Sequence, residues 1–237
     1  MSTMAEVAAN PSVVAAPRVS ALRRHLPNAL TVFRVVLATA FFVLLSLWHG
    51  LASARRPPGS GAELTLVATG IIFIVAAITD ALDGFLSRRW GVVSTFGRVM
   101  DPFADKVLVV GSFLFLAGPD FHVAQHNGTG LQVSGVLPWM VVVIIARELL
   151  VTSIRGLVEG RGQSFQANAW GKIKMTLQSV AIPTILAAIA IFDVSAGTPA
   201  RWTIDGLVWV TVAATAISGI PYIFRGIQAC REPGDAS

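Results

Sequence analysis

Long apolar segments alternate with short polar ones along the whole chain. A helix needs about 20 residues to cross a hydrocarbon core of about 30 Å, and six of the apolar segments provide this length. The expected helices cover residues 30–51, 63–90, 97–118, 136–160, 170–192 and 204–224. The pattern therefore predicts an all-α integral membrane protein with six transmembrane helices.

Composition supports this class. Of the 237 residues, 54% are hydrophobic and 13% are charged, against about 25% charged in an ordinary soluble domain. Residues 1–20 lack the basic start and long apolar core of a cleaved signal peptide, so we expect a disordered leader there. A six-helix domain is expected at 21–228 and a short C-terminal tail at 229–237. The single cysteine, Cys230, excludes an intrachain disulfide.

The positions of the basic residues predict how the chain is oriented in the membrane. Lys and Arg are in excess on the cytoplasmic side of membrane proteins. With six spans and an inner N-terminus, twelve basic residues fall on the inner side, and only Arg55, Arg56 and Arg201 fall in outer loops. Both termini are therefore expected in the cytoplasm. Arg34, Lys106 and Arg147 lie within the predicted spans.

Four aspartates interrupt the apolar pattern between residues 80 and 105. Asp80 follows 16 uncharged residues, about 24 Å of helix, and so lies at the inner boundary of its span. The next helix can cross the membrane only if it begins before Asp101. Both pairs, Asp80 with Asp83 and Asp101 with Asp105, then lie at the same depth on antiparallel helices. Each pair also shares one helix face.

Four carboxylates this close repel one another and need cations nearby to stay ionised. Clustered carboxylate oxygens are the ligands that Mg²⁺, Mn²⁺ and Ca²⁺ prefer, and two such ions about 4 Å apart can hold both ends of a phosphoryl displacement. The alternative is structural neutralisation by Arg88, Arg89, Arg98 and Lys106.

A second group of charges is basic and belongs to the fourth and fifth predicted helices. Arg147, Arg155, Lys172 and Lys174 all lie toward the cytoplasmic half, with Glu148 as a structural partner of Arg147. A cluster of Arg and Lys suits a phosphate dianion. The alternative is that these residues serve membrane orientation and lipid headgroup contact.

The stretch "DALDGFLSRRWGVVSTFGRVMDPFAD" resembles the signature of the CDP-alcohol phosphatidyltransferases, D-x2-D-G-x2-A-R-x8-G-x3-D-x3-D. Every spacing is kept, and Ser87 stands where Ala is usual. Three further segments resemble the phosphatidylglycerophosphate synthases within that family: "PNALTVFRVVLA" from Pro27, "ARELLVTSIRG" from Ala146 and "GKIKMTLQ" from Gly171. In the last segment Met175 stands where relatives often carry Thr.

The resemblance implies a transferase that moves the phosphatidyl group of CDP-diacylglycerol to glycerol 3-phosphate and releases CMP. It implies two Mg²⁺ or Mn²⁺ ions per site, held by Asp80, Asp83, Asp101 and Asp105, with Asp105 also the general base. The implied donor-binding residues are Asn28, Thr31, Gly84, Arg88, Ser94 and Gly97. The acceptor phosphate would meet Arg147, Arg155, Lys172 and Lys174.

The expected setting is the cell (inner) membrane, with the active site facing the cytoplasm. Partners would be the two substrates and membrane lipids, with a possible homodimer and no nucleic acid. Inositol phosphate is the alternative acceptor, since it is also an anionic phosphate. From another class, a transporter or a non-catalytic scaffold remains an alternative, although the chain shows no internal repeat.

Overall fold

Six helices make up most of the computed structural model, which describes residues 21–48, 62–90, 95–124, 130–160 and 169–231. The helices are α1 (Ala21–Leu47), α2 (Ala62–Trp90), α3 (Thr95–Leu116), α4 (Pro138–Gly160), α5 (Ala169–Ile191) and α6 (Pro199–Arg231). A single 3₁₀ turn, η1 (Pro119–Phe121), and two antiparallel strands, β1 (His122–Ala124) and β2 (Gly130–Gln132), connect α3 to α4. The predicted six helices are confirmed. The short strand pair lies in a segment that the sequence pattern predicted to be a loop.

Two helices extend well beyond their predicted bounds. Helix α1 begins at Ala21 rather than at residue 30, and α6 runs from Pro199 to Arg231 rather than over 204–224. The predicted bounds followed the apolar residues, which mark only the part of a helix that lies in hydrocarbon. The helical backbone continues beyond them into polar sequence, so the helices are longer than predicted. Pro199 fits the first position of α6 because its ring fixes φ near the helical value.

Among the residues that the structure describes, four helices contain segments long and apolar enough to cross a membrane. These segments are Ala29–Leu47, Glu63–Leu86, Trp170–Ile191 and Pro199–Gln228. By its helix composition the chain is therefore a multi-pass membrane protein. The expected leader at 1–20 lies outside the described residues, as does most of the tail.

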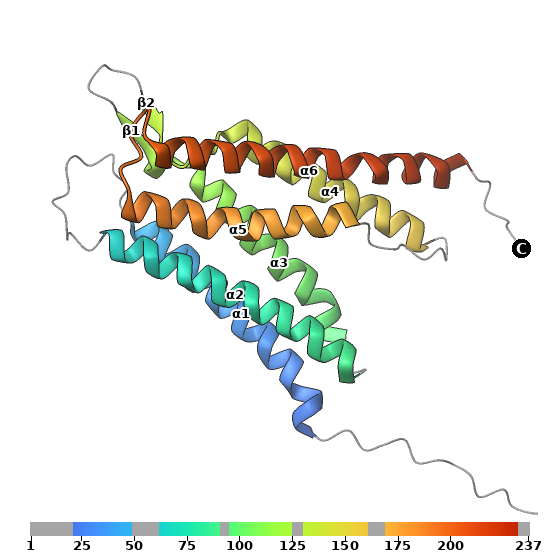
Figure 1. Ribbon diagram of the computed structural model, residues 1–237. Helices are drawn as coiled ribbons and strands as arrows, with labels where there is room; N and C mark the ends of the chain where they lie inside the picture. The colour runs from blue at the N-terminus through green and yellow to red at the C-terminus, as the bar shows by residue number, and fades with distance from the viewer. Residues whose placement is uncertain (1–20, 49–61, 91–94, 125–129, 161–168, 232–237) are drawn as a thin grey trace, which may run out of the picture.

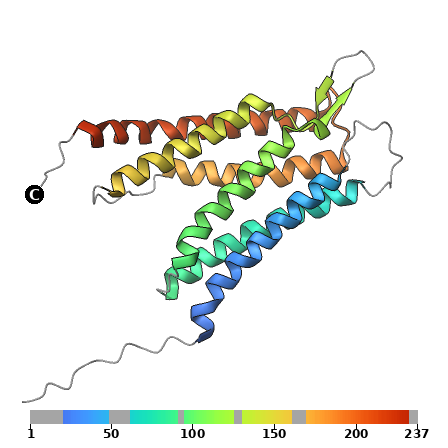
Figure 2. The same ribbon diagram turned by 180° about the vertical axis from the view of Figure 1, so that it is seen from behind.

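The helices form two groups, as Figures 1 and 2 show from opposite sides. Helix α2 packs between α1 and α5, and α3 packs mainly on α1. Helix α6 packs against both α4 and α5. The group α1–α3 and the group α4–α6 meet near the strand pair and splay apart toward the opposite end (Figure 1). The splayed end contains the C-terminus of α2 and the N-termini of α3 and α5, where the sequence places its charged clusters.

Aromatic packing joins the helices within the bundle. The ring centroids of Phe41 and Phe73 are 5.8 Å apart, which joins α1 to α2, and those of Phe42 and Phe115 are 5.4 Å apart, which joins α1 to α3. A Cβ on Gly111 would lie 2.4 Å from Cζ of Phe42, so the absence of a side chain there allows this close approach.

Polar contacts complete the end of the bundle beside the strands. Gln132 Nε2 donates a hydrogen bond of 2.7 Å to the Leu116 carbonyl. Arg201 Nε donates to Asp205 Oδ2 at 2.8 Å, and Arg201 Nη1 donates to the Gln132 carbonyl. These contacts connect β2 to α3 and to α6, so the polar groups at this end bind one another and the backbone.

Candidate active site

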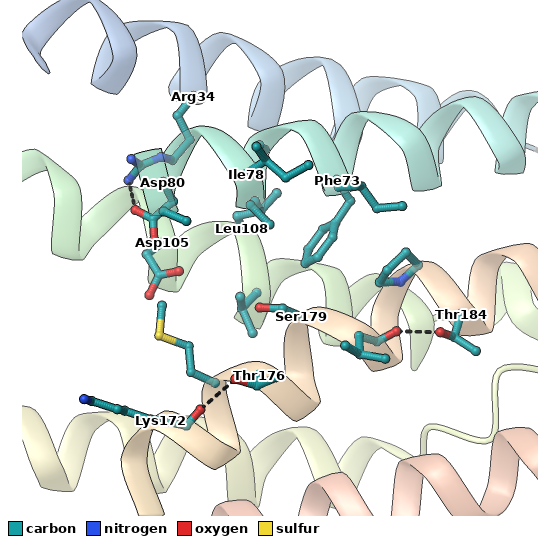
Figure 3. Close-up of a pocket in the computed structure, with 18 of the residues that line it drawn as sticks. Arg34, Phe73, Ile78, Asp80, Asp105, Leu108, Lys172, Thr176, Ser179 and Thr184 are labelled. Atoms are coloured by element: carbon teal, nitrogen blue, oxygen red, sulfur yellow. Dashed lines mark hydrogen bonds and ion pairs between the residues drawn. The ribbon is translucent and has the colours of Figure 1, made fainter. Parts of the chain in front are cut away.

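Helices α1 and α2 bring an arginine against two of the predicted aspartates. Asp80 and Asp83 lie one turn apart near the end of α2. Arg34 reaches Asp80 from α1, as Figure 3 shows. Arg34 Nη1 is 2.5 Å from Asp80 Oδ1, and Arg34 Nη2 is 3.8 Å from Asp83 Oδ2. The side chains of Arg34 and Asp83 are buried, whereas that of Asp80 is 31% exposed. A buried arginine at this depth requires anionic partners, and the two aspartates provide them.

Asp105 of α3 lines the same cavity as Arg34 and Asp80. We call Arg34, Asp80, Asp83 and Asp105 the acidic cluster. The cavity has a volume of about 890 Å³ and is lined mainly by α2 and α5. Asp105, Asp80, Arg34 and Lys172 form its polar end (Figure 3).

The rest of the cavity wall is mainly apolar, with the hydroxyl side chains of Thr176, Ser179 and Thr184 among its residues. Phe73, Ile78, Val180 and Ala187 contribute to it, and the side chains of Ile78 and Val180 are more than half exposed on the outside of the bundle. In a membrane that outside surface faces lipid. The cavity therefore joins a charged end to a wall that suits hydrocarbon.

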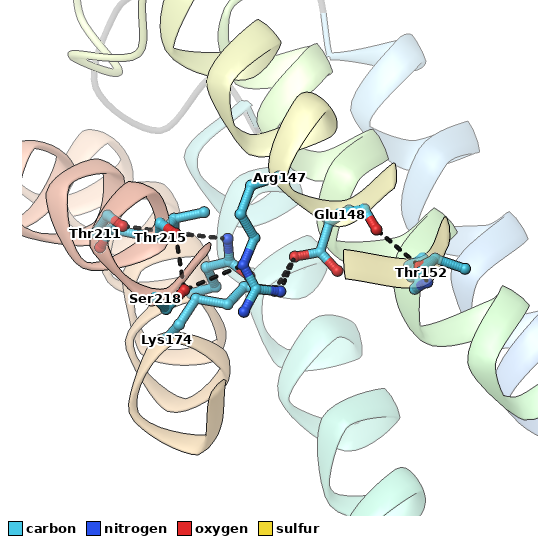
Figure 4. Close-up of polar contacts among 9 residues, drawn as sticks. Arg147, Glu148, Thr152, Lys174, Thr211, Thr215 and Ser218 are labelled. Carbon is cyan, nitrogen blue, oxygen red and sulfur yellow. Dashed lines mark hydrogen bonds and ion pairs between the residues drawn. The ribbon is translucent and has the colours of Figure 1, made fainter. Parts of the chain in front are cut away.

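A second group of charges, which we call the basic cluster, consists of Arg147, Glu148 and Lys174. Arg147 Nε donates a hydrogen bond of 3.1 Å to Ser218 Oγ of α6, and Arg147 Nη1 donates to Glu148 Oε1 at 3.1 Å (Figure 4). The guanidinium also lies over the ring of Tyr222, 5.5 Å from its centroid. Lys174 of α5 makes an ion pair with the same Glu148 oxygen. The basic cluster is thus buried where α4, α5 and α6 meet.

Asp105 is the member of the acidic cluster that faces the basic cluster. Besides the large cavity, it lines a small second cavity together with Lys106, Glu148 and Lys174. Lys106 is itself engaged, because its ammonium donates to the Thr152 hydroxyl of α4. One carboxylate therefore borders both an acid-rich space and a space lined by cations.

The remaining predicted site residues are placed in different surroundings. Thr31 is buried on α1, one turn before Arg34, and Gly84 is partly buried on α2 next to Asp83. Lys172 is exposed and lines the large cavity, while Arg155 is exposed two turns beyond Arg147 on α4. Five predictions fall outside the described side chains: Asn28, Arg88, Ser94, Gly97 and Asp101.

Sequence reasoning missed Arg34, Ser218 and Tyr222 as parts of these clusters. Arg34 could have been found, because an arginine inside an apolar span needs an anionic partner at the same depth, and Asp80 was already placed there. Ser218 and Tyr222 lie within an apolar helix, and nothing in their local sequence indicates that they contact Arg147.

The donor atoms of the acidic cluster suit a divalent cation. Asp80, Asp83 and Asp105 offer carboxylate oxygens, which are the hard ligands that Mg²⁺ and Mn²⁺ prefer. Within the described side chains, which do not include Asp101, no three His, Cys, Asp or Glu residues are grouped closely enough to hold a metal. The chemistry of the residues fits such an ion, although the arrangement in the structure is that of an arginine-bound cluster.

Comparison with known proteins assigns the chain to a class. The family model described as CDP-alcohol phosphatidyltransferase matches residues 24–217. The chain therefore belongs to the CDP-alcohol phosphatidyltransferase family, as its sequence predicted, and it is a membrane transferase of phospholipid synthesis.

Individual relatives narrow this class. The CDP-diacylglycerol–glycerol-3-phosphate 3-phosphatidyltransferase of Bacillus subtilis is 31% identical over 210 residues, covering 87% of this chain and 97% of the relative. The probable phosphatidylglycerophosphate synthase of Mycobacterium tuberculosis is 33% identical over 205 residues, covering 86% and 82%. A Salmonella typhimurium relative with the same printed name as the Bacillus protein is 34% identical over 190 residues, covering 73% and 87%.

Proposed function

We propose that this chain is a phosphatidylglycerophosphate synthase, which transfers the phosphatidyl group of CDP-diacylglycerol to glycerol 3-phosphate and releases CMP. The names of the similar proteins support this acceptor. The observation that carries the proposal is the position of Asp105, which lines the large cavity with Asp80 and the small cavity with Lys174 and Glu148. A base that activates an acceptor hydroxyl needs both reactants beside it.

The large cavity supports a lipid donor. CDP-diacylglycerol carries a charged diphosphate and two acyl chains, and the cavity joins a charged end to an apolar wall. The diphosphate would lie at the end with Asp80 and Lys172, and an acyl chain along Phe73 and Ala187. Contacts from Asn28, Thr31, Gly84, Arg88, Ser94 and Gly97 to the CDP part belong to the same proposal.

A divalent ion completes the donor site in this proposal. Asp80, Asp83, Asp101 and Asp105 would hold Mg²⁺ or Mn²⁺, two per site. Such ions neutralise the charge of the diphosphate and so make its phosphorus easier to attack.

Asp105 would act on the acceptor. Its carboxylate removes the proton from the acceptor hydroxyl as the hydroxyl oxygen bonds to the β-phosphorus. The bond from that phosphorus to the bridging oxygen breaks, and CMP leaves with the bridging oxygen. The chain contributes mainly by holding the two substrates in line.

The basic cluster would bind the phosphate of the acceptor. Arg147 and Lys174 share one oxygen of Glu148, so they are already held next to each other before an anion arrives. The bonds from Arg147 to Ser218 and Glu148 fix the guanidinium plane, and a guanidinium suits a phosphate through two parallel hydrogen bonds. Arg155 and Lys172 would assist from more exposed positions.

Orientation and assembly extend the proposal. We expect six transmembrane spans, with both termini and the active site on the cytoplasmic face of the cell membrane. Twelve basic residues fall on that side and only three in the outer loops. A homodimer stays a prediction. In intact cells a thiol reagent that cannot cross membranes should leave Cys230 unlabelled, and labelling would show that the orientation is reversed.

The test of the proposed function is a competition between acceptors. Purified protein is incubated with CDP-diacylglycerol, Mg²⁺ and equal concentrations of glycerol 3-phosphate, inositol phosphate and serine, and the lipid products are separated by mass. We expect phosphatidylglycerophosphate as the main product and no CMP release in excess EDTA. A different main product would overturn the acceptor, and full activity in EDTA would overturn the metal.

A further inference from the structure

Arg34 is bound to the acidic cluster in an unusual way. It is 1% exposed and forms ion pairs with Asp80 and Asp83. Yet Nε, Nη1 and Nη2 are all buried without a hydrogen-bond partner within the described part of the chain. The contact of Nη1 with Asp80 is short enough for an ion pair but lacks the alignment of a hydrogen bond. Charge, rather than directed hydrogen bonds, therefore holds Arg34 in place.

Arg147 provides the contrast within the same molecule. Its guanidinium makes hydrogen bonds to Ser218 and Glu148 and lies over the Tyr222 ring. If the carboxylates of Asp80 and Asp83 turned toward another cation, Arg34 would give up Coulombic attraction but no well-aligned hydrogen bond. Because Arg34 is buried and cannot leave the site, its positive charge stays close to any second cation that the two carboxylates bind.

Other basic side chains near the acidic cluster are placed differently. Lys172 is exposed at the cavity, and Lys106 donates to the Thr152 hydroxyl. Arg34 makes ion pairs with both Asp80 and Asp83. It therefore places positive charge against both carboxylates within a span, which reduces their mutual repulsion.

We propose that Arg34 is an internal counter-cation: it neutralises Asp80 and Asp83 while no divalent ion is bound, and its charge opposes the divalent ion and so limits the affinity of the site. This inference rests on the part of the proposed function in which the acidic cluster binds Mg²⁺ or Mn²⁺. It adds that the affinity is set by an arginine on α1, outside the aspartate motif.

The experiment is a titration of the full-length protein with Mn²⁺ in detergent micelles, without substrates, followed by electron paramagnetic resonance of the free ion. Arg34→Gln removes the charge and keeps a polar side chain. We expect its Kd for Mn²⁺ to be about 10- to 100-fold lower than that of the wild type, because one positive charge close to the ion is removed.

Two control variants separate this effect from others. Arg34→Lys keeps the charge, so its Kd should stay within about threefold of the wild type. Arg201→Gln removes one arginine beside the strand pair, where Arg201 is paired with Asp205. Its Kd should be unchanged, which tests whether net charge alone alters Mn²⁺ binding.

Thermal unfolding is the second measurement. In EDTA the Arg34→Gln protein should unfold at a temperature about 3–8 °C below the wild type, because its carboxylates then repel one another without a counter-cation. Saturating Mn²⁺ should remove most of this difference. If Arg34→Gln and Arg34→Met both fail to fold even when purified in Mn²⁺, the proposal is wrong, because a divalent ion would then be unable to replace the arginine.

The outcomes distinguish this inference from the proposed function. If the wild type binds Mn²⁺ but Arg34→Gln binds it equally or more weakly, the counter-cation role is overturned and the metal site stands. If neither protein binds Mn²⁺, the metal site itself is overturned, and this inference fails with it.

Discussion

The two charged clusters at the splayed end of the bundle differ in the sign of their excess charge. The acidic cluster has three carboxylates and one guanidinium, which makes ion pairs with two of them, whereas in the basic cluster two cations share one carboxylate. Each cluster also borders a different space: the acidic one a cavity of about 890 Å³ with apolar walls, and the basic one a small cavity beside Asp105. Excess negative charge suits a metal ion, and excess positive charge suits a phosphate.

The clusters also differ in how rigidly they hold their arginines. Arg147 is fixed by Ser218, Glu148 and Tyr222, so its geometry exists before an anion binds. Arg34 is held by ion pairs with Asp80 and Asp83, without a hydrogen bond from its guanidinium among the described residues, so its position depends on the charge of these carboxylates. A fixed arginine suits a site that must orient a bound phosphate. An arginine held by ion pairs suits a site whose carboxylates also bind a metal ion.

The largest effect is expected where the two clusters meet. Asp105→Asn keeps the shape of the side chain but removes the base, so kcat should fall by about 100- to 10,000-fold. The rate of CMP release measures it. Asp205→Asn, which alters an aspartate beside the strand pair, should retain nearly full activity. Retention of a tenth or more of the wild-type kcat in Asp105→Asn would remove Asp105 from the base role.

Two lysines on the first turns of α5 test whether the acceptor binds at the small cavity or at the large one. Lys174 is buried against Glu148, whereas Lys172 is exposed at the large cavity. Lys174→Gln should lower kcat/KM for glycerol 3-phosphate by about 10- to 150-fold, since a hydrogen bond to a charged group contributes about 1.5–3 kcal/mol. Lys172→Gln should lower it by less than about fivefold. Equal losses would indicate that burial in the basic cluster does not matter for the acceptor.

The apolar wall lines the large cavity, which also borders the acidic cluster. A change in this wall should alter the KM for the donor and not the KM for the acceptor. Ala187→Phe places a ring in the large cavity and should raise the KM for long-chain CDP-diacylglycerol by about 10-fold, with a smaller effect for a short-chain donor. Ala146→Phe, at an exposed position on α4, is the matched control. A rise in the KM for glycerol 3-phosphate instead would show that the cavity holds the acceptor.

The smallest effect is expected far from both clusters. Arg201→Gln removes the ion pair with Asp205 and the hydrogen bond to the Gln132 carbonyl. Because the pair is partly exposed, the free energy of unfolding should fall by less than about 1.5 kcal/mol. Activity at a temperature well below unfolding should be unchanged. A loss of turnover without a loss of stability would mean that this end of the bundle communicates with the site.

The sequence predicted the features that follow from periodicity and depth. The six helices and the position of Asp80 near the end of α2 follow from apolar run length and helical spacing. The pairing of Arg147 with Glu148 was expected only because the two residues are neighbours in the sequence. The family also followed, because a motif with fixed spacings in one segment depends little on tertiary packing.

The features that depend on contacts between distant helices could not be predicted in the same way. The Arg147–Ser218 bond joins residues 71 positions apart, and the choice of Ser218 depends on how α4 packs against α6. The strands β1 and β2 are three residues each, too short for a pattern of alternating polarity. Helix ends were missed at Ala21 and Arg231, where helical backbone continues past the apolar run.

The account assigns the donor to the acidic cluster and the acceptor to the basic cluster. Steady-state kinetics in which both substrates are varied for each variant test this assignment most directly. CDP-diacylglycerol and glycerol 3-phosphate are each varied against the wild type, Arg147→Ala, Arg147→Lys and Asp80→Asn. Arg147→Ala should raise the KM for glycerol 3-phosphate by about 10-fold or more and leave the donor KM within about twofold, with partial recovery in Arg147→Lys. Asp80→Asn should lower kcat and weaken the donor while sparing the acceptor KM. Equal impairment of both substrates by Arg147→Ala and Asp80→Asn would contradict the separation of an acidic donor side from a basic acceptor side.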